Sequence, residues 1–343
     1  MIKSDKPLLN VLNGQPTDYV PLWLMRQAGR YLPEYRQLRA KAKNFLDLCF
    51  TPQLASEITL QPIRRFHFDA AIIFADILLI PFALGQRLEF REGEGPLLDA
   101  INSENELSRL TFNIDRLSSV FETIGLVKEK LDTQTALIGF CGAPWTVACY
   151  MIDGTSKNSF AKTQVWAKEK PQWLEKLISI LITVSEKYLL RQIEAGAEII
   201  QIFDSWAGLL QNDMFERWVI NPTKEIITRI KQKHPHVPII GFPREARAMY
   251  AAYATHTGVD AMSIDQQVLL TEAQQLQKIK LLQGNLDPRL LVKGGDEMHQ
   301  AVTAILTKLG SKHVFNLGHG ILPETPLTHV EELIKIVRNR NKI

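Results

Sequence analysis

Short apolar runs alternate with longer amphipathic stretches along the chain, and this alternation is the clearest structural signal in the sequence. Eight of the runs, several of them rich in β-branched residues, have the length of buried strands. The predicted strands are Val20–Met25, Ala70–Ala75, Ala136–Phe140, Glu198–Phe203, Val237–Phe242, Ala261–Ile264, Ile279–Leu282 and His313–Leu317. Between them, apolar residues recur at three- and four-residue spacing, as in Trp173–Glu194, which predicts amphipathic helices.

Strands that alternate with helices pair in parallel through helical crossovers, so the pattern predicts an α/β fold. Eight such units suit a single (β/α)8 TIM-type barrel of roughly this length. Because no low-complexity linker divides the sequence, we expect residues 1–343 to form one catalytic domain. The non-periodic stretch Arg87–Glu104, which contains residues 92–96 (EGEGP), is expected to be an excursion over the barrel. An open doubly wound sheet is the alternative architecture.

The residues that directly follow the predicted strands are the first place to look for function, because barrels carry their active sites at the carboxyl ends of the strands. Nearly all of these positions are polar or rich in glycine, which a purely structural scaffold does not need. In chain order they are Arg26 and Arg30, Asp76, Gly142–Trp145, Asp204 and Ser205, Pro243 and Arg244, Asp265, Gly284–Pro288, and Gly318–Gly320.

The arginine pair Arg26 and Arg30 follows the first predicted strand, next to Gly29, where backbone can approach a ligand closely. Guanidinium groups hold carboxylates through two parallel hydrogen bonds, so this pair suits a small polyanion. In the alternative interpretation, Arg26, Arg30 and Glu34 form a solvated ion-pair row on one helix. Asp76, after the second strand, is similarly open between a functional carboxylate and a helix N-cap.

Charge and composition exclude several classes of protein. A net charge of +3 with 22% charged residues indicates neither disorder nor a nucleic-acid-binding domain. Residues 1–65 carry ten Lys and Arg against five Asp and Glu, an excess that suits an anionic small molecule. The most apolar stretch, Ala70–Leu84, contains Asp76 and Pro81 and is too short to span a bilayer.

Cysteine usage and the N-terminal residues indicate a compartment. The three cysteines, Cys49, Cys141 and Cys149, include no CxxC pair and favour a reducing environment. Residues 1–7 (MIKSDKP) carry charges and a proline where a signal peptide has an apolar core, so we expect a cytoplasmic protein without a membrane partner. His234 and His236 lie in a polar turn without further ligands nearby, so no metal site is expected.

Six longer motifs make the chain resemble the uroporphyrinogen decarboxylase family nearly from end to end. They are Arg26–Arg36 (RQAGRYLPEYR), Ile73–Leu78 (IFADIL), Gly139–Thr146 (GFCGAPWT), Gln201–Gly208 (QIFDSWAG), Gln283–Pro288 (QGNLDP) and Asn316–Gly320 (NLGHG). The resemblance implies a (β/α)8 barrel that acts as a homodimer in haem and tetrapyrrole synthesis. The implied reaction converts the four acetate arms of uroporphyrinogen III to methyls, giving coproporphyrinogen III and four carbon dioxide molecules.

The chemistry of that reaction can be compared with the residues present. Loss of carbon dioxide from an acetate arm leaves a carbanion, which needs an electron sink. The sequence has no convincing motif for pyridoxal phosphate, thiamine, a dinucleotide or a phosphate-binding P-loop. A protonated pyrrole can be its own sink, so we expect no cofactor. The family pattern then implies Asp76 as the acceptor of the four pyrrole N–H groups and the stabiliser of the cationic ring.

The resemblance also implies which residues line the substrate site. It assigns Arg26 and Arg30, with Asp76, to catalysis, because the arginines orient the acid arms. The implied substrate-binding residues are Arg26, Gln27, Ala28, Gly29, Arg30, Asp76, Tyr150, Ser205 and His319. The proton donor to the ring stays open between Arg26, Arg30 with a bound water, and His319.

Two other functions compete with the decarboxylase. Zinc-dependent corrinoid methyltransferases of the same superfamily take a His-x-Cys motif near the seventh strand and a Cys near the eighth. The corresponding stretches here, Leu281–Asn285 and Asn316–His319, contain no cysteine. A catalytically silent tetrapyrrole-binding protein could lose Asp76 or Tyr150, and both are present. A direct activity assay separates binding from catalysis.

Overall fold

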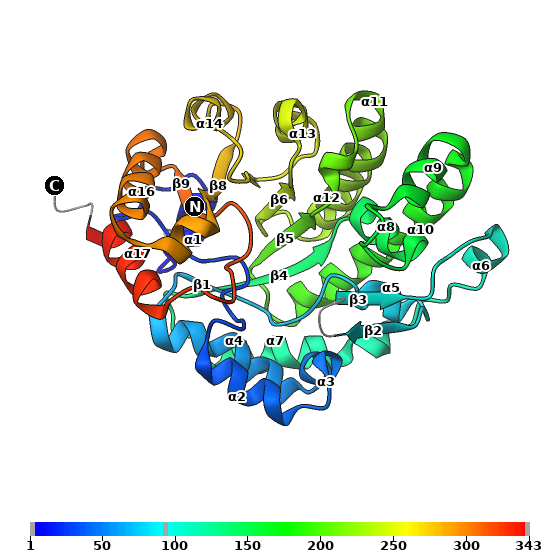
Figure 1. Ribbon diagram of the computed structural model, residues 1–343, viewed down its shortest axis with the longest axis horizontal. Coiled ribbons are helices and arrows are strands. Elements are labelled where there is room, and N and C mark those ends of the chain that lie inside the picture. Colours follow the sequence, from blue (N-terminus) through cyan, green and yellow to red (C-terminus); the bar gives the residue numbers. More distant parts are fainter. Residues whose placement is uncertain (1–3, 92–94, 340–343) are drawn as a thin grey trace.

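Seven parallel strands form one curved sheet in the computed structural model, which describes residues 4–91 and 95–339. The strands follow one another in chain order across the sheet, and helices surround it (Figure 1). The strands are β1 (Ala70–Ile72), β4 (Ala136–Gly142), β5 (Ile199–Asp204), β6 (Ile239–Pro243), β7 (Ala261–Ser263), β8 (Leu281–Leu286) and β9 (His313–Leu317). The α/β class and the parallel pairing predicted from the sequence are confirmed.

Helical connections join consecutive strands of the sheet, as parallel pairing requires. The α-helices are α1 (Pro7–Leu12), α2 (Pro33–Lys41), α3 (Phe45–Phe50), α4 (Pro52–Phe66), α5 (Leu79–Ala83), α6 (Glu104–Ser108), α7 (Ser118–Lys130), α8 (Pro144–Asp153), α9 (Ala161–Glu169), α10 (Pro171–Glu194), α11 (Asn212–Phe215), α12 (Asn221–Lys233), α13 (Tyr250–His256), α14 (Leu270–Gln277), α15 (Pro288–Lys293), α16 (Gly295–Leu309) and α17 (Leu327–Asn339). Three segments are 3-10 helices, η1 (Ile114–Leu117), η2 (Ala207–Leu209) and η4 (Arg247–Met249), and η3 (Glu216–Ile220) is a π-helix. Helix α10 confirms the amphipathic pattern of Trp173–Glu194.

The first predicted strand, Val20–Met25, is reduced to a single bridging residue, Leu22, which pairs in parallel with Phe315 of β9. The Phe315 N–H donates to the Pro21 carbonyl (2.8 Å), and the Asp69 N–H, just before β1, donates to the Leu22 carbonyl (2.9 Å). The segment therefore lies between β9 and β1. It does not continue as a strand because Pro21 has no N–H and the Leu22 N–H donates to the Asp69 side chain (2.7 Å). The prediction of eight full strands is corrected to seven strands and one bridge.

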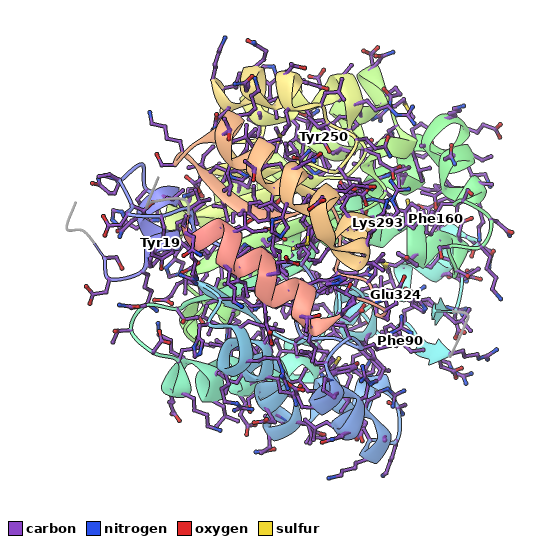
Figure 2. The ribbon with its side chains drawn as sticks, turned by 60° about the vertical axis from the view of Figure 1, so that its left-hand side comes forward. Tyr19, Phe90, Phe160, Tyr250, Lys293 and Glu324 are labelled. Carbon is purple, nitrogen blue, oxygen red and sulfur yellow. The ribbon has the colours of Figure 1, made fainter. Side chains whose placement is uncertain are left out.

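Asp69 fastens this closing segment at the amino-terminal ends of the strands. Its carboxylate, 5% exposed, accepts from the Tyr19 hydroxyl (2.7 Å) and lies 3.4 Å from the Arg338 guanidinium on α17. Figure 2 shows Tyr19 on the opposite side of the molecule from Phe160, which packs near the carboxyl ends of the strands. The N-terminal segment, β1 and the C-terminal helix are thus joined at one buried carboxylate.

A buried polar network fills the space inside the curved sheet. The Gln283 amide on β8 donates to Ser263 of β7 (2.6 Å) and to Gln201 of β5 (3.1 Å), and it accepts from the Trp23 indole (2.8 Å). Because these partners come from strands that are not all neighbours, their side chains point into the interior. The inside of the sheet is therefore packed, and a ligand has to bind at one end of the strands.

Other predicted boundaries differ from the structure in instructive ways. The seventh predicted strand, Ile279–Leu282, lies earlier in the chain than β8, because strand pairing continues through the polar residues of Leu281–Leu286. The stretch Arg87–Glu104, expected to be an excursion, contains an antiparallel pair, β2 (Leu88–Arg91) and β3 (Gly95–Leu98), which forms a sheet of its own. Residues 92–94 of the EGEGP motif and residues 1–3 of the N-terminal segment lie outside the described residues. Among the residues described, no helix is long and apolar enough to cross a membrane.

Candidate active site

Five side chains from separate loops and one helix interact electrostatically at the carboxyl ends of the strands. Arg26 follows the bridging segment, Asp76 follows β1, Tyr150 lies on α8, Arg244 follows β6, and His319 follows β9. Arg26 interacts with Asp76, Tyr150 and Arg244, and His319 interacts with both arginines. The structure therefore brings four of the predicted site residues together and adds Arg244 to them.

Arg26 stands at the centre of this cluster. Its backbone adopts φ +61°, a left-handed conformation that is uncommon for a residue with a side chain and is often found at functional sites. The side chain is exposed to solvent, yet burial by surrounding protein is the main cause of its lowered pKa. Both observations fit a side chain that reaches solvent while protein surrounds its charged group. Asp76 and Tyr150 raise the pKa of Arg26, whereas Arg244 and Arg30 lower it further.

The absence of a side chain at Gly320 leaves the space that Arg26 occupies. A Cβ atom added at Gly320 would stand 2.3 Å from Arg26 Cδ and 2.9 Å from its Nε. The Ile321 N–H also donates to the Met25 carbonyl (2.8 Å), which ties the loop after β9 to the segment before Arg26. The glycine of the NLGHG motif is thus required for close packing against the arginine.

Asp76 is half-buried, and only one of its two carboxylate oxygens accepts a hydrogen bond among the described residues. Oδ1 accepts from the Leu78 N–H (2.8 Å), so the aspartate does help to shape the turn before α5. Oδ2 has no hydrogen-bond partner among the described residues. Burial raises the pKa of Asp76 to about 6, while the Leu78 N–H and the Arg26 charge act in the opposite direction. The alternative interpretation of Asp76 as a helix N-cap is wrong, because the N-cap of α5 is Leu78 and Asp76 shapes the turn two residues earlier.

His319 is held as a neutral imidazole. Its Nδ1 accepts a hydrogen bond from the Gly320 N–H (2.5 Å), so Nδ1 carries a lone pair and the ring proton of the neutral form is on Nε2. Burial, with Arg26 and Arg244, lowers the pKa of His319 to about 3. In its neutral form His319 can donate one hydrogen bond from Nε2. The proton donor to the ring stays open between Arg26, Arg30 with a bound water, and His319.

Tyr150 belongs to the cluster through its interaction with Arg26, whereas Ser205 shows no such interaction within the described residues. The Tyr150 ring is half-buried and meets Phe160 edge-on, with centroids 5.0 Å apart. Burial raises the pKa of Tyr150, and Asp76 adds to that rise, so the hydroxyl stays protonated as a donor. Ser205 directly follows β5 and is half-buried. No hydrogen bond joins Ser205 to another candidate residue in the described part of the chain.

The four remaining predicted residues differ in their exposure to solvent. Arg30 is exposed, and Ala28 and Gly29 are partly exposed, so all three can meet a ligand. Gln27 is fully buried: its side chain accepts from the Leu24 N–H (3.0 Å) and donates to the Ala70 carbonyl (2.9 Å). Its side chain is committed to joining the arginine loop to β1.

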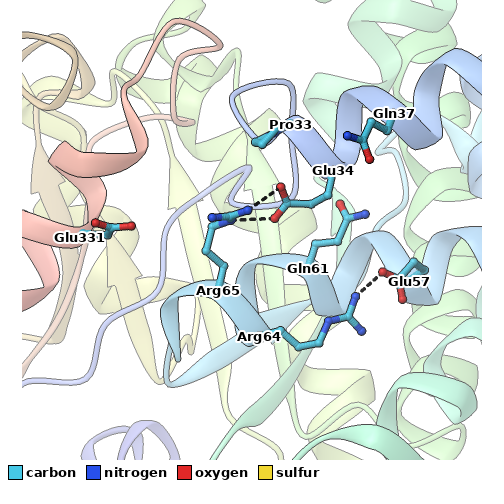
Figure 3. A pocket seen from close by; sticks show the side chains of 8 residues that line it. All are labelled: Pro33, Glu34, Gln37, Glu57, Gln61, Arg64, Arg65 and Glu331. Carbon is cyan, nitrogen blue, oxygen red and sulfur yellow. Dashed lines mark hydrogen bonds and ion pairs between the residues drawn. The ribbon is translucent and has the colours of Figure 1, made fainter.

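The alternative ion-pair row is wrong. Residues 26–32 are not helical, because α2 begins only at Pro33. Glu34 pairs instead with Arg65, through two hydrogen bonds of 2.8 and 3.0 Å (Figure 3). Glu34 and Arg65 line a surface depression of about 580 Å³ between α2, α4 and α17 that contains none of the predicted site residues. Arg26 and Arg30 are therefore left without this acid.

Asp204 is a buried acid that sequence reasoning left without a role, although it stands at a strand end. The Thr146 hydroxyl donates to Oδ1 (2.5 Å) and accepts from the Trp206 N–H (3.0 Å). Burial raises the pKa of Asp204 to about 7, and the bonds from Thr146 lower it. Asp204 thus fastens the loop that carries Ser205. Like Asp204, Arg244 could be identified from the sequence by its position at the end of a predicted strand.

The chemistry of the cluster indicates a class of protein. A parallel α/β sheet presents two interacting arginines, one carboxylate that interacts with Arg26, and two neutral hydrogen-bond donors at one end. That set suits a polyacidic small molecule that also carries N–H groups or a developing positive charge. Within the described residues, no group of three His, Cys, Asp or Glu side chains is placed to hold a metal ion.

Comparison with known proteins gives the family. A model described as uroporphyrinogen decarboxylase (URO-D) matches residues 3–340. The uroporphyrinogen decarboxylase of Chelativorans sp. (strain BNC1) is 51% identical over 338 residues, covering 98% of each chain. That of Rhodospirillum rubrum is 48% identical over 340 residues, again covering 98% of each chain. The chain belongs to the uroporphyrinogen decarboxylase family.

Solved structures show the same architecture at much lower identity. A methyltransferase from Methanosarcina mazei superimposes with a TM-score of 0.79 at 21% identity, covering 98% of this chain and 99% of the other. A B12-independent methionine synthase from Shewanella sp. W3-18-1 gives a TM-score of 0.56 at 11% identity, covering 85% and 86%. These likenesses concern the fold alone.

Proposed function

We propose that this protein decarboxylates uroporphyrinogen III to coproporphyrinogen III, turning its four acetate arms into methyls. Membership of the uroporphyrinogen decarboxylase family supports this function, and so do relatives of that name that are 51% and 48% identical. The observation that carries the proposal is the Asp76 carboxylate, half-buried beside Arg26 with one oxygen free. A polyacid with inward-facing N–H groups needs both of these groups at once.

Each decarboxylation is balanced without an external oxidant or reductant. A proton adds to the pyrrole carbon beside the acetate-bearing carbon and makes the ring a cation. The bond between the acetate methylene and its carboxylate then breaks, carbon dioxide leaves, and the bonding electrons pass into the ring. A second proton adds to the exocyclic carbon, the ring proton is lost, and the arm ends as a methyl. The cationic ring is the electron sink, so we propose that no cofactor takes part.

Asp76 is proposed to hold the substrate by its N–H groups and to stabilise the cationic ring. A carboxylate offers only acceptors, and its partial burial would make its charge act on the ring more strongly than it would in water. Arg26 and Arg30 would orient the acid arms as two-pronged donors. Tyr150, Ser205 and the Nε2–H of His319 would add neutral hydrogen bonds. Gln27, Ala28 and Gly29 would shape the site through the backbone.

We further propose a cytoplasmic homodimer in which residues 1–343 form one domain. The three cysteines are unpaired and buried, as suits a reducing compartment. One hydrophobic cluster extends from Leu8 to Val337, which supports a single folding unit. The dimer rests on the family resemblance alone, and sedimentation of the purified protein tests it.

The test of function is anaerobic incubation of purified, metal-stripped protein with uroporphyrinogen III. Products are oxidised to porphyrins and separated by carboxylate number. We expect a ladder from eight carboxylates to four without added cofactor. Binding without a ladder would identify a silent tetrapyrrole-binding protein, and a ladder that appears only after zinc is restored would contradict the metal-free chemistry.

A further inference from the structure

We propose that Arg244 is a further substrate-binding residue that holds an acid arm of the tetrapyrrole beside Arg26. The inference rests on the proposed function and extends it to a residue outside the family motifs quoted above. Arg244 directly follows β6, and its side chain is 19% exposed. Its charge acts on both Arg26 and His319, so it belongs to the same electrostatic cluster.

The backbone around Arg244 is fixed by the loops on both sides. The Arg244 N–H donates to the Asp204 carbonyl (3.1 Å), and the Arg244 carbonyl accepts from the Gly208 N–H (3.1 Å). The next N–H, that of Glu245, donates to the buried Asp265 carboxylate (2.7 Å). Such anchoring places the arginine before a ligand arrives, which reduces the entropy lost on binding.

The guanidinium of Arg244 is only partly paired within the protein. One terminal nitrogen donates to the Glu245 side chain. The Nε atom is buried and has no hydrogen-bond partner among the described residues. A guanidinium has five N–H donors, so this single acid leaves most of its capacity unused. Unused charged donors next to a second arginine attract a carboxylate.

The balance of charge in the cluster points the same way. Arg26 and Arg244 repel each other. His319 interacts with both arginines, but its neutral ring provides no negative charge to offset them. Asp76 offsets Arg26 in part, and Glu245 offsets Arg244 in part. A carboxylate arm bound between the arginines would relieve their repulsion. The eight acid arms of the proposed substrate supply such a group.

The competing explanation is that Arg244 only pairs with Glu245 to shape its loop. Three variants separate the two: Arg244→Ala, Arg244→Lys and Glu245→Gln. If Arg244 binds substrate, Arg244→Ala raises KM and Kd for uroporphyrinogen III about tenfold or more, since a charge-assisted hydrogen bond is lost. Arg244→Lys recovers part of the loss, and Glu245→Gln leaves KM within about twofold because the arginine remains.

The matched control is Arg229→Ala, which removes an arginine that pairs with Glu186 and Glu225 on the outer helices. Its KM and Kd should equal those of the wild type. Should Arg244→Ala fail to fold, judged by its circular dichroism spectrum, Arg244→Lys and Arg244→Gln replace it. Unchanged KM and Kd in the folded Arg244 variants, or equal effects of Arg244→Ala and Glu245→Gln, would overturn the proposal.

Kd for uroporphyrinogen III is measured by stopped-flow binding in the first milliseconds after anaerobic mixing, before turnover consumes the ligand. If the wild type binds but forms no product ladder, the proposed function fails while Kd still decides the role of Arg244. If the wild type forms the ladder and the Arg244 variants keep wild-type KM and Kd, the function stands and Arg244 is excluded from the substrate site.

Discussion

The charge on Asp76 is set by burial and by two neighbours, which act on its pKa in opposite directions. Burial raises its pKa to about 6, and the Leu78 N–H and Arg26 limit that rise. A catalytic carboxylate in this position has to be ionised to stabilise a cationic ring. The same desolvation that raises the pKa also strengthens the interaction of the ionised form with the substrate.

The first prediction is that kcat/KM for uroporphyrinogen III falls as the pH drops through about 6, because Asp76 becomes protonated in the free enzyme. Arg26→Ala should move this acid limb to higher pH, since the arginine that lowers the pKa of Asp76 is gone. A pH–rate profile of both proteins checks this, with Arg229→Ala as the control. An acid limb that stays in place in Arg26→Ala would contradict the assignment.

At the scale of elements, the loop after β9 and the arginine loop have to approach closely. The second prediction is that Gly320→Ala lowers kcat/KM strongly, because the new methyl would displace Arg26. The effect should be at least about tenfold, as small displacements of positioning groups can cost a hundredfold. Gly125→Ala on α7 is the matched control, because a Cβ there has no atom within 4 Å. Equal activity of the two variants would show that Arg26 is free to move.

The strands themselves are largely predictable from the sequence. His313–Leu317 is predicted to the residue because Val314, Phe315 and Leu317 keep it apolar, although His313 and Asn316 are polar. Polar residues such as Gln283 and Asn285 obscure the extent of β8, since their side chains form buried hydrogen bonds. The segment around Leu22 is predicted as a full strand, because periodicity does not reveal that the Leu22 N–H donates a hydrogen bond to the Asp69 side chain.

The candidate site is likewise only partly predictable from the sequence. The strand-end positions of Arg26, Asp76 and Arg244 are apparent in the sequence, because the barrel rule identifies the ends that matter. The contact between Arg26 and Gly320 joins residues far apart in the chain, so only the structure reveals it. Likewise, the sequence shows neither that Gln27 is committed to Ala70 nor that Glu34 is committed to Arg65.

At the scale of the whole molecule, Asp69 joins the two ends of the chain to β1. The third prediction is that Asp69→Ala lowers the free energy of unfolding by about 2–4 kcal/mol, because Arg338, Tyr19 and the Leu22 N–H lose a buried acceptor. Urea denaturation measures the change, and Asp99→Ala, at an exposed position, is the control. Equal stability of the two variants would mean that the closing segment is held by its apolar contacts alone.

The measurement that tests the central claim most directly is the turnover of Asp76→Asn with uroporphyrinogen III, followed anaerobically without cofactor. The amide keeps the shape of the side chain but loses its charge, so we predict that turnover falls about a hundredfold or more. The variant should remain folded. Because the pKa of Asp76 is raised on folding, the wild type loses stability as the pH rises through about 6, and the asparagine does not. At pH 7.5 the melting temperature of the variant should therefore equal or exceed that of the wild type. Wild-type turnover in the folded Asp76→Asn variant would contradict the account.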